Sequence, residues 1–384
     1  MTVFTKSNIG YFTTANRLVS QPMEGNDAVD GGKPSERTIN RYKKLAHGNW
    51  GVVIVEAISV VNTSLARING LILNERNLDS FKKLVDEFKK INNETVLLFQ
   101  MSHSGMKSGN FSEKVTLCPG QSSEYKYLST DDIENIKQKF VSSILLAEKA
   151  GADGIDFKMC HGYFGAEMLR PMNTRDDKWG GSLENRTRFL SESISGIKSN
   201  LIDKNKFLLG SRLSVYEAIK GGCGTNNPNE IIEDLIEQAE IIELMSSLGM
   251  DYVNVSAGIP GVTSEVTRPT NGSKNLYLNH FRYAKFAKEV LKKLNSEMKV
   301  FGSAYSILKK EAIDFANENI DKKYTDFAGF GRLSFSDPLY PKKIANNEKI
   351  NFCTACSGCS KLMIKQLNTG CIIFDDYYKK LIKK

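Results

Sequence analysis

Short apolar runs alternate with amphipathic segments along most of the chain. The runs are rich in β-branched and aromatic residues and are bounded by glycine or polar residues, as expected of buried strands. We predict eight strands, at residues 17–20, 51–60, 95–101, 154–158, 207–213, 252–256, 299–302 and 326–329.

The segments between these runs carry the period of helices with one apolar face. The first clear example is residues 131–149, where Thr130 is a plausible N-cap and Gly151 a stop. The second is residues 229–248, which Gly249 ends. The positions expected to face inward are Ile133, Ile136, Phe140, Ile144 and Ala147 in the first helix, and Ile232, Leu235, Ala239 and Ile242 in the second.

Eight strand–helix cycles predict an α/β fold, a (β/α)8 TIM barrel with enlarged loops. We expect the barrel to occupy residues 1–345 and a short cysteine-rich tail to occupy residues 346–384. A doubly wound sheet is the alternative. It would normally carry a GxGxxG turn after its first strand, and the chain has no such motif.

The composition narrows the class of protein. Of the 384 residues, 41% are hydrophobic and 25% are charged, which is typical of a globular chain. The net charge of +8 comes from scattered lysines beside Glu or Asp, so nucleic acid is not an expected partner. No apolar run is long enough for a membrane span and no secretion signal is seen, so we expect a cytoplasmic protein.

Four polar side chains crowd the exit of the fourth predicted strand, namely Lys158, Cys160, His161 and Tyr163. In parallel sheets and barrels, ligands bind at the carboxyl ends of the strands. A basic, an imidazole and a phenolic group at such a place can polarise a carbonyl and deliver a proton.

The strand ends together resemble the old yellow enzyme family of flavin oxidoreductases. The matching pieces are NRLVSQPM (16–23), QMSHSGM (100–106), HGYF (161–164), WGGSLENRTRF (179–189), RLS (212–214), SAG (256–258) and GFGRLSFSDP (329–338). They appear in the family's order, and GGSLENR is the most specific. The resemblance implies a barrel that holds FMN at its C-terminal mouth and reduces an activated carbon–carbon double bond with electrons from NADH or NADPH.

The resemblance also implies a set of FMN-binding residues. Gly302, Gly331 and Arg332 would hold the phosphate, because glycines let backbone amides approach and arginine supplies a charged fork. Gln100 would face the pyrimidine edge of the flavin, and Arg212 would stabilise the reduced anion near N1. The expected set is Pro22, Met23, Ala57, Gln100, Arg212, Gly302, Ser303, Gly331 and Arg332.

Three residues are expected to be catalytic. Lys158 and His161 occupy the positions at which the family holds the substrate carbonyl, and Tyr163 matches its proton donor. Lys158 is a departure, since histidine is more usual. Glu24 is another, because relatives often carry Cys or Thr there, and a carboxylate beside the flavin would disfavour its reduction unless it is protonated or points away. Met106 replaces an arginine of the usual motif.

The tail contains four cysteines in a metal-like spacing, Cys353, Cys356, Cys359 and Cys371. It resembles the cluster after the barrel of 2,4-dienoyl-CoA reductases, which holds [4Fe–4S] and has a third interval one residue longer. Four thiolates suit iron–sulfur, while zinc or free thiols are the alternatives.

The leading hypothesis is therefore an FMN-dependent ene reductase whose partner is a small unsaturated carbonyl compound. Two alternatives stay open: a Schiff-base aldolase that uses Lys158, and a non-catalytic binder of flavin or steroid. The sequence leaves open the natural substrate, the choice of NADH or NADPH, and whether the chain forms a homo-oligomer.

Overall fold

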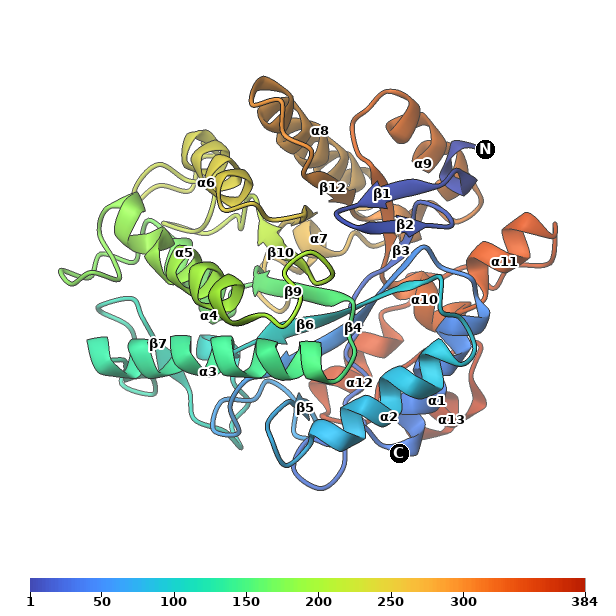
Figure 1. Cartoon of the computed structure of the whole chain (residues 1–384), viewed down its shortest axis with the longest axis horizontal. Coiled ribbons are helices and arrows are strands. Elements are labelled where there is room, and N and C mark those ends of the chain that lie inside the picture. Colours follow the sequence, from blue (N-terminus) through green and yellow to red (C-terminus); the bar gives the residue numbers. More distant parts are fainter. Residues whose placement is uncertain (384) are drawn as a thin grey trace.

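Eight parallel strands close into a barrel in the computed structural model, which describes residues 1–383 (Figure 1). Closure comes from the pairing of the first barrel strand with both the second and the last. All eight predicted strands are confirmed to within one residue at each end. They are β3 (Leu18–Ser20), β4 (Val52–Ser59), β6 (Val96–Ser102), β9 (Gly154–Met159), β10 (Leu208–Ser214), β11 (Tyr252–Ser256), β12 (Lys299–Gly302) and β13 (Phe327–Phe330).

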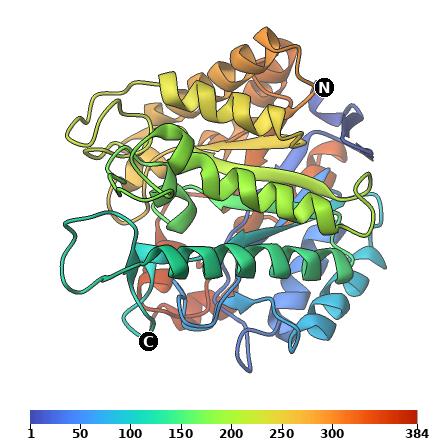
Figure 2. The same cartoon turned by 60° about the vertical axis from the view of Figure 1, so that its left-hand side comes forward.

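Helices cover the outside of the barrel, and Figure 2 shows α3 (Thr130–Lys149), α5 (Leu183–Asn200), α6 (Ile236–Ser247) and α8 (Tyr277–Lys293) side by side. No helix within residues 1–383 is both long enough and apolar enough to cross a membrane. The helices of ten or more residues are α1 (Glu36–His47), α2 (Leu78–Lys89), α3 (Thr130–Lys149), α5 (Leu183–Asn200), α6 (Ile236–Ser247), α8 (Tyr277–Lys293) and α9 (Ala312–Asp321).

Shorter elements lie in the loops and at the two ends of the chain. The short helices are α4 (Phe164–Leu169), α7 (Ser264–Thr267), α10 (Arg332–Ser336), α11 (Tyr340–Ala345), α12 (Gly358–Ile364) and α13 (Asp376–Leu381). The 3₁₀ turns are η1 (Thr2–Phe4), η2 (Gly105–Lys107), η3 (Lys274–Leu276) and η4 (Tyr305–Glu311). The minor strands are β1 (Ser7–Ile9), β2 (Phe12–Thr14), β5 (Leu71–Ile72), β7 (Val115–Thr116) and β8 (Lys126–Tyr127).

Both predicted helices form, but each begins differently from the prediction. The N-cap of α3 is Ser129 and not Thr130, because Ser129 and Asp132 exchange hydrogen bonds in a capping box. Helix α6 begins at Ile236 and not at residue 229. The Glu230 carboxylate instead accepts from the amides of the two residues after it, which favours a turn over a helix. Ile232 is consequently 69% exposed and does not face inward.

The apolar core has two layers. The inner one fills the barrel, where Tyr252 and Phe301 stack with ring centroids 4.4 Å apart, and Ile9 of the β1–β2 hairpin packs against it. The outer layer lies between the strands and the helices. There Phe157 of β9 stacks on Phe140 of α3 at 4.7 Å and meets the edge of Phe189 of α5. These contacts fix β9, whose exit carries the predicted catalytic residues.

The tail folds back onto the barrel. The amide of Thr369 donates to the carbonyl of Gly25, and Asn26 exchanges hydrogen bonds with Leu367 and Asn368. Helix α13 also contacts α1, where the Arg37 guanidinium carbon lies 3.5 Å from the Tyr377 ring centroid. The loop after β3 is therefore held by the C-terminal residues. The boundary between barrel and tail near residue 345 stays a proposal.

Replacing Phe157 by alanine tests the outer layer. Because the ring is fully buried between two helices, we expect the free energy of unfolding to fall by about 3–5 kcal/mol, measured by urea denaturation. Phe111→Ala is the control, since that ring is 42% exposed and its loss should cost about 0.5 kcal/mol or less. Equal effects of the two changes would contradict this packing.

Candidate active site

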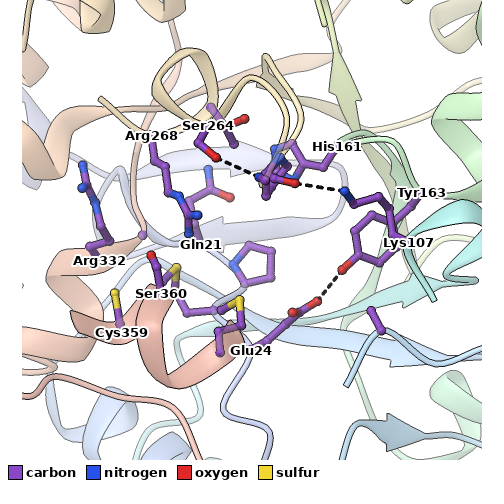
Figure 3. A pocket seen from close by; sticks show the side chains of 18 of the residues that line it. Gln21, Glu24, Lys107, His161, Tyr163, Ser264, Arg268, Arg332, Cys359 and Ser360 are labelled. Carbon is purple, nitrogen blue, oxygen red and sulfur yellow. Dashed lines mark hydrogen bonds between the residues drawn. The ribbon is translucent and has the colours of Figure 1, made fainter. Parts of the chain in front are cut away.

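A cavity of about 450 Å³ opens at the carboxyl ends of the barrel strands (Figure 3). Its volume lies within the range usual for small-molecule sites. Ten of the twelve residues predicted to be catalytic or flavin-binding line it together. They are Pro22, Met23, Gln100, Lys158, His161, Tyr163, Arg212, Ser303, Gly331 and Arg332.

The other two predicted flavin-binding residues, Ala57 and Gly302, are not among the residues that line the cavity. Ala57 lies in β4 where the pairing with β6 shifts register between Val55 and Ile58. Gly302 ends β12, and a Cβ there would lie 3.1 Å from the Thr325 hydroxyl. Close packing inside the barrel wall is thus a sufficient reason for this glycine.

Arg212 supplies a fixed positive charge on the cavity floor. Its guanidinium donates to the side-chain oxygens of Gln21, Asn254 and Ser256, which are all neutral groups. Burial lowers the pKa of Arg212, although arginine stays protonated in proteins. Beside it, Gln100 donates through Nε2 to Asp156 at 2.7 Å. That bond fixes the amide and leaves its carbonyl oxygen free for a ligand.

A tight turn after β9 aims His161 into the cavity. His161 and Gly162 both have positive φ, 64° and 73°, and their amides donate to Ser214 and Glu217. The imidazole Nε2 lies 2.7 Å from the Ser256 hydroxyl. Burial, together with the nearby cations Arg212 and Lys158, holds the pKa of His161 well below its usual range. The ring is therefore neutral and retains one N–H to donate.

Glu24 lies at the centre of a charged cluster that also contains Arg67, Lys158 and Tyr163. Its carboxylate accepts from the Tyr163 hydroxyl at 3.0 Å (Figure 3). It also pairs with Arg67 Nε at 2.7 Å and Lys158 Nζ at 3.5 Å. Lys158 Nζ also lies 3.5 Å from the Tyr163 ring centroid. Burial alone would raise the pKa of Glu24, but Arg67 and Lys158 outweigh it and lower the pKa to about 2.

The sequence left two ways to reconcile Glu24 with a flavin, protonation or an outward orientation, and neither is what the structure has. The carboxylate is ionised and lines the cavity, and two cations neutralise it. The same cluster also shifts the pKa values of Lys158 and Tyr163. Although burial opposes it, Tyr163 and Glu24 raise the pKa of Lys158. Burial and Glu24 raise the pKa of Tyr163, so its hydroxyl keeps a proton to donate.

One end of the cavity suits a phosphate. The backbone amides of Ser303, Gly331 and Arg332 donate to no acceptor within residues 1–383. A Cβ at Gly331 would meet only the Met23 sulfur, at 3.2 Å. Arg332 lines the cavity and donates one hydrogen bond to the carbonyl of Pro269. Unpaired amides beside a guanidinium are the donors that a phosphate dianion needs, so these residues fit the phosphate of FMN.

Several residues of the cavity wall were not predicted. Arg67 and Arg268 come from irregular loops and Lys107 from the short 3₁₀ turn η2, and neither kind of segment carries a periodic signal. The tail also contributes Cys359, Ser360, Met363, Ile364 and Gln366, from α12 and the residues after it. A sequence alone does not show that residues so far along the chain return to the barrel mouth.

The four tail cysteines line a second cavity, of about 20 Å³, next to Arg332. That volume holds about one water molecule. Within residues 1–383, no group of three or more such side chains is placed to hold a metal ion, and the four thiols form no disulfide. The side chains as they lie do not fit a [4Fe–4S] cluster, which stays a prediction from the sequence spacing alone.

Comparison with known proteins agrees with the geometry. The sequence model of the NADH:flavin oxidoreductase / NADH oxidase family matches residues 2–351. NADPH dehydrogenase of Clostridium acetobutylicum is 32% identical over 265 residues, which are 67% of this chain and 74% of that protein. NADH oxidase of Thermoanaerobacter brockii is 26% identical over 373 residues, 93% of this chain.

The chain spans 53% of the length of that NADH oxidase. Among solved structures, a complex of 2-naphthoyl-CoA reductase with 2-naphthoyl-CoA has a TM-score of 0.80 at 22% identity, over 99% of this chain and 58% of that one. This last likeness supports the barrel fold alone. The family match across the barrel and the C. acetobutylicum relative show that the chain belongs to the NADH:flavin oxidoreductase / NADH oxidase family.

Proposed function

We propose that the protein is an FMN-dependent ene reductase that takes electrons from NADH or NADPH and reduces a small unsaturated carbonyl compound. One observation carries the proposal. Lys158, His161 and Tyr163, at the exit of β9, line the same cavity as the residues that suit a flavin and its phosphate. A hydride acceptor and a proton donor would therefore meet in one space.

When bound, FMN supplies the hydride that it has received from the nicotinamide. In our proposal Gln100 and Arg212 hold its ring, and Ser303, Gly331 and Arg332 hold its phosphate. The fixed charge of Arg212 would favour the reduced anionic form of the ring. Arg212 donates its hydrogen bonds to neutral groups and forms no direct ion pair with a carboxylate within residues 1–383.

The protein's own part in the chemistry is to polarise the substrate and to supply a proton. Lys158, kept protonated by Glu24, and the neutral imidazole of His161 would donate to the carbonyl oxygen. These hydrogen bonds withdraw electron density and make the β-carbon a better hydride acceptor. The Tyr163 hydroxyl would then give its proton to the α-carbon, as the hydride bonds to the β-carbon and the double bond becomes single.

Lys158 is poorly suited to the aldolase alternative. A Schiff-base lysine has to be a neutral amine to attack a ketone, yet Tyr163 and the ion pair with Glu24 raise the pKa of Lys158. A non-catalytic binder would also bind flavin, but its reduced flavin would not be reoxidised by an unsaturated carbonyl compound. The experiments below separate these possibilities.

Tyr163→Phe tests the proton donor. The change removes the hydroxyl that would protonate the α-carbon, so reoxidation of the reduced flavin by an enone should slow by about one hundred- to ten thousand-fold. Reduction of the flavin by NADH or NADPH needs no such proton and should persist. Anaerobic stopped-flow absorbance measures the two half-reactions separately. Equal loss of both would remove Tyr163 from this role.

Arg332→Gln tests the phosphate end of the cavity. We expect FMN affinity to fall by about ten- to a hundred-fold, because a charge-assisted hydrogen bond to the dianion is lost. Riboflavin lacks the phosphate, so its affinity should not change. Titrating both flavins into apoprotein gives the comparison. A parallel loss for the two flavins would show that Arg332 only shapes the fold.

Glu24→Gln tests the charged cluster through pH. The pKa of Glu24 is about 2 in the folded protein and 4.5 ordinarily, so its ionisation contributes on the order of 3 kcal/mol to stability above pH 4.5. That contribution is lost as pH falls from 4.5 toward 2. The gap in unfolding free energy between wild type and variant should therefore be full at neutral pH and shrink in acid. Glu311→Gln, at an exposed pair with Lys274, is the control. A gap independent of pH would contradict the ion pairing.

A further inference from the structure

The charge on the cavity wall is strongly one-sided. Glu24 is the one carboxylate among the described residues that line it, and His161 is neutral. Six cationic side chains line the same space, namely Arg67, Lys107, Lys158, Arg212, Arg268 and Arg332. A cavity of one sign concentrates ligands of the opposite sign and repels ligands of the same sign.

Four of these cations are accounted for by an ion pair or by the proposed flavin site. Glu24 neutralises part of the charge of Arg67 and Lys158, with which it pairs. In the proposed function, Arg212 faces the flavin ring and Arg332 faces its phosphate. Lys107 and Arg268 remain, and neither forms an ion pair with a carboxylate within residues 1–383.

Arg268 is the stronger indication of an anionic ligand, because its side chain has no partner within residues 1–383. It follows α7, in a segment held by the hydrogen bond from His280 to the carbonyl of Val266. Its guanidinium is half-buried and makes no hydrogen bond or ion pair with any other of residues 1–383. Burial lowers the pKa of Arg268, and the neighbouring Arg332 adds to this. The guanidinium lines the cavity with its N–H donors unused by the described residues, so an anionic ligand in the cavity can accept from it.

Lys107 adds to the same field from another loop. It ends η2, after β6, and its Nζ donates to the carbonyl of Pro260 at 3.0 Å. Figure 3 shows Lys107 on the side of Tyr163, and Arg268 on the side of Arg332 and Cys359. A ligand lying above the flavin between these two sides would experience both charges.

We propose that the electron acceptor is an anion, an α,β-unsaturated carbonyl compound that also carries an acidic group, which Arg268 binds and Lys107 attracts. This inference rests on the proposed function and narrows its substrate class. It disfavours amines as substrates, because a protonated amine would enter a cavity lined by cations. The acidic group is a carboxylate or a phosphate, since a guanidinium binds both in the same forked geometry.

The test compares 4-oxopent-2-enoate, which is an anion, with its neutral methyl ester, which is larger by one methyl group. Dithionite-reduced holoprotein is mixed with each acceptor without oxygen and at low ionic strength, and the dependence of the flavin reoxidation rate on acceptor concentration gives a second-order rate constant. The acid should exceed the ester by about ten-fold in the wild type. Arg268→Gln should lower this acid-to-ester ratio about five-fold or more. The matched control is Lys274→Gln, which removes a charge from the same loop outside the cavity and should keep the wild-type ratio.

Two results would overturn the inference. An acid-to-ester ratio that is the same in wild type and Arg268→Gln would show that Arg268 does not recognise the acceptor. An unchanged ratio combined with weaker FMN retention, or with weaker NADH or NADPH binding, would assign Arg268 to a phosphate of the flavin or of the donor.

A binding measurement separates this inference from the proposed function. Calorimetry with levulinate and methyl levulinate, the saturated analogues, needs no turnover. If neither unsaturated acceptor reoxidises the wild type, the proposed function fails. Levulinate binding that is lost in Arg268→Gln and kept in Lys274→Gln would still support an anion site. Equal binding of levulinate and its ester by the wild type would refute one.

Discussion

Closure of the barrel is the constraint on which the site depends. Residues 18–20 of β3 pair with residues 328–330 of β13, so the two ends of the barrel sequence meet at one rim. This pairing brings Gln21 beside Gly329, where a Cβ would lie 2.2 Å from the Gln21 amide nitrogen and 2.5 Å from the Gly302 carbonyl oxygen. A glycine is required at that contact. Without closure of the barrel, the residues that suit the phosphate and the residues proposed to bind the substrate would not line the same cavity.

Ion pairing between Glu24 and its neighbouring cations then determines which groups at the rim are protonated. Placing a carboxylate and a lysine in a buried cavity is costly, and each is tolerated because the other is present. Glu24 thereby keeps Lys158 protonated, directs the Tyr163 hydroxyl and remains ionised itself. The cavity as a whole stays positive, which suits a phosphorylated flavin and, in our inference, an anionic acceptor. The substitution of a carboxylate at this position is compatible with flavin chemistry because two cations compensate it.

Most of the fold could be predicted from the sequence, because each strand is marked by its own residues and by those that flank it. The barrel strands are buried on both faces and bounded by glycine or polar residues, so their pattern survives in the structure to within one residue. The residues of the β9 exit could also be predicted to line one site, because parallel strands end at a common rim. The start of α6 could not, since the Glu230 side chain competes with the helix for backbone amides.

The missed parts of the site depend on contacts between segments distant in sequence. Arg67 and Arg268 lie in irregular loops, and the position of the Arg67 side chain follows from its ion pair with Glu24. The wall formed by α12 depends on the return of the tail to Gly25 and Asn26. The neutralisation of Glu24 required knowing that Arg67 faces it. No periodic pattern encodes such pairings, because each joins residues with unrelated neighbours.

The central claim is that this cavity holds one FMN without a covalent bond. The most direct test is to purify the protein, denature it, and identify the released small molecule by mass spectrometry and absorbance. The account predicts FMN, in a ratio approaching one per chain after reconstitution. A chain that stays folded but retains no flavin after incubation with excess FMN would contradict it.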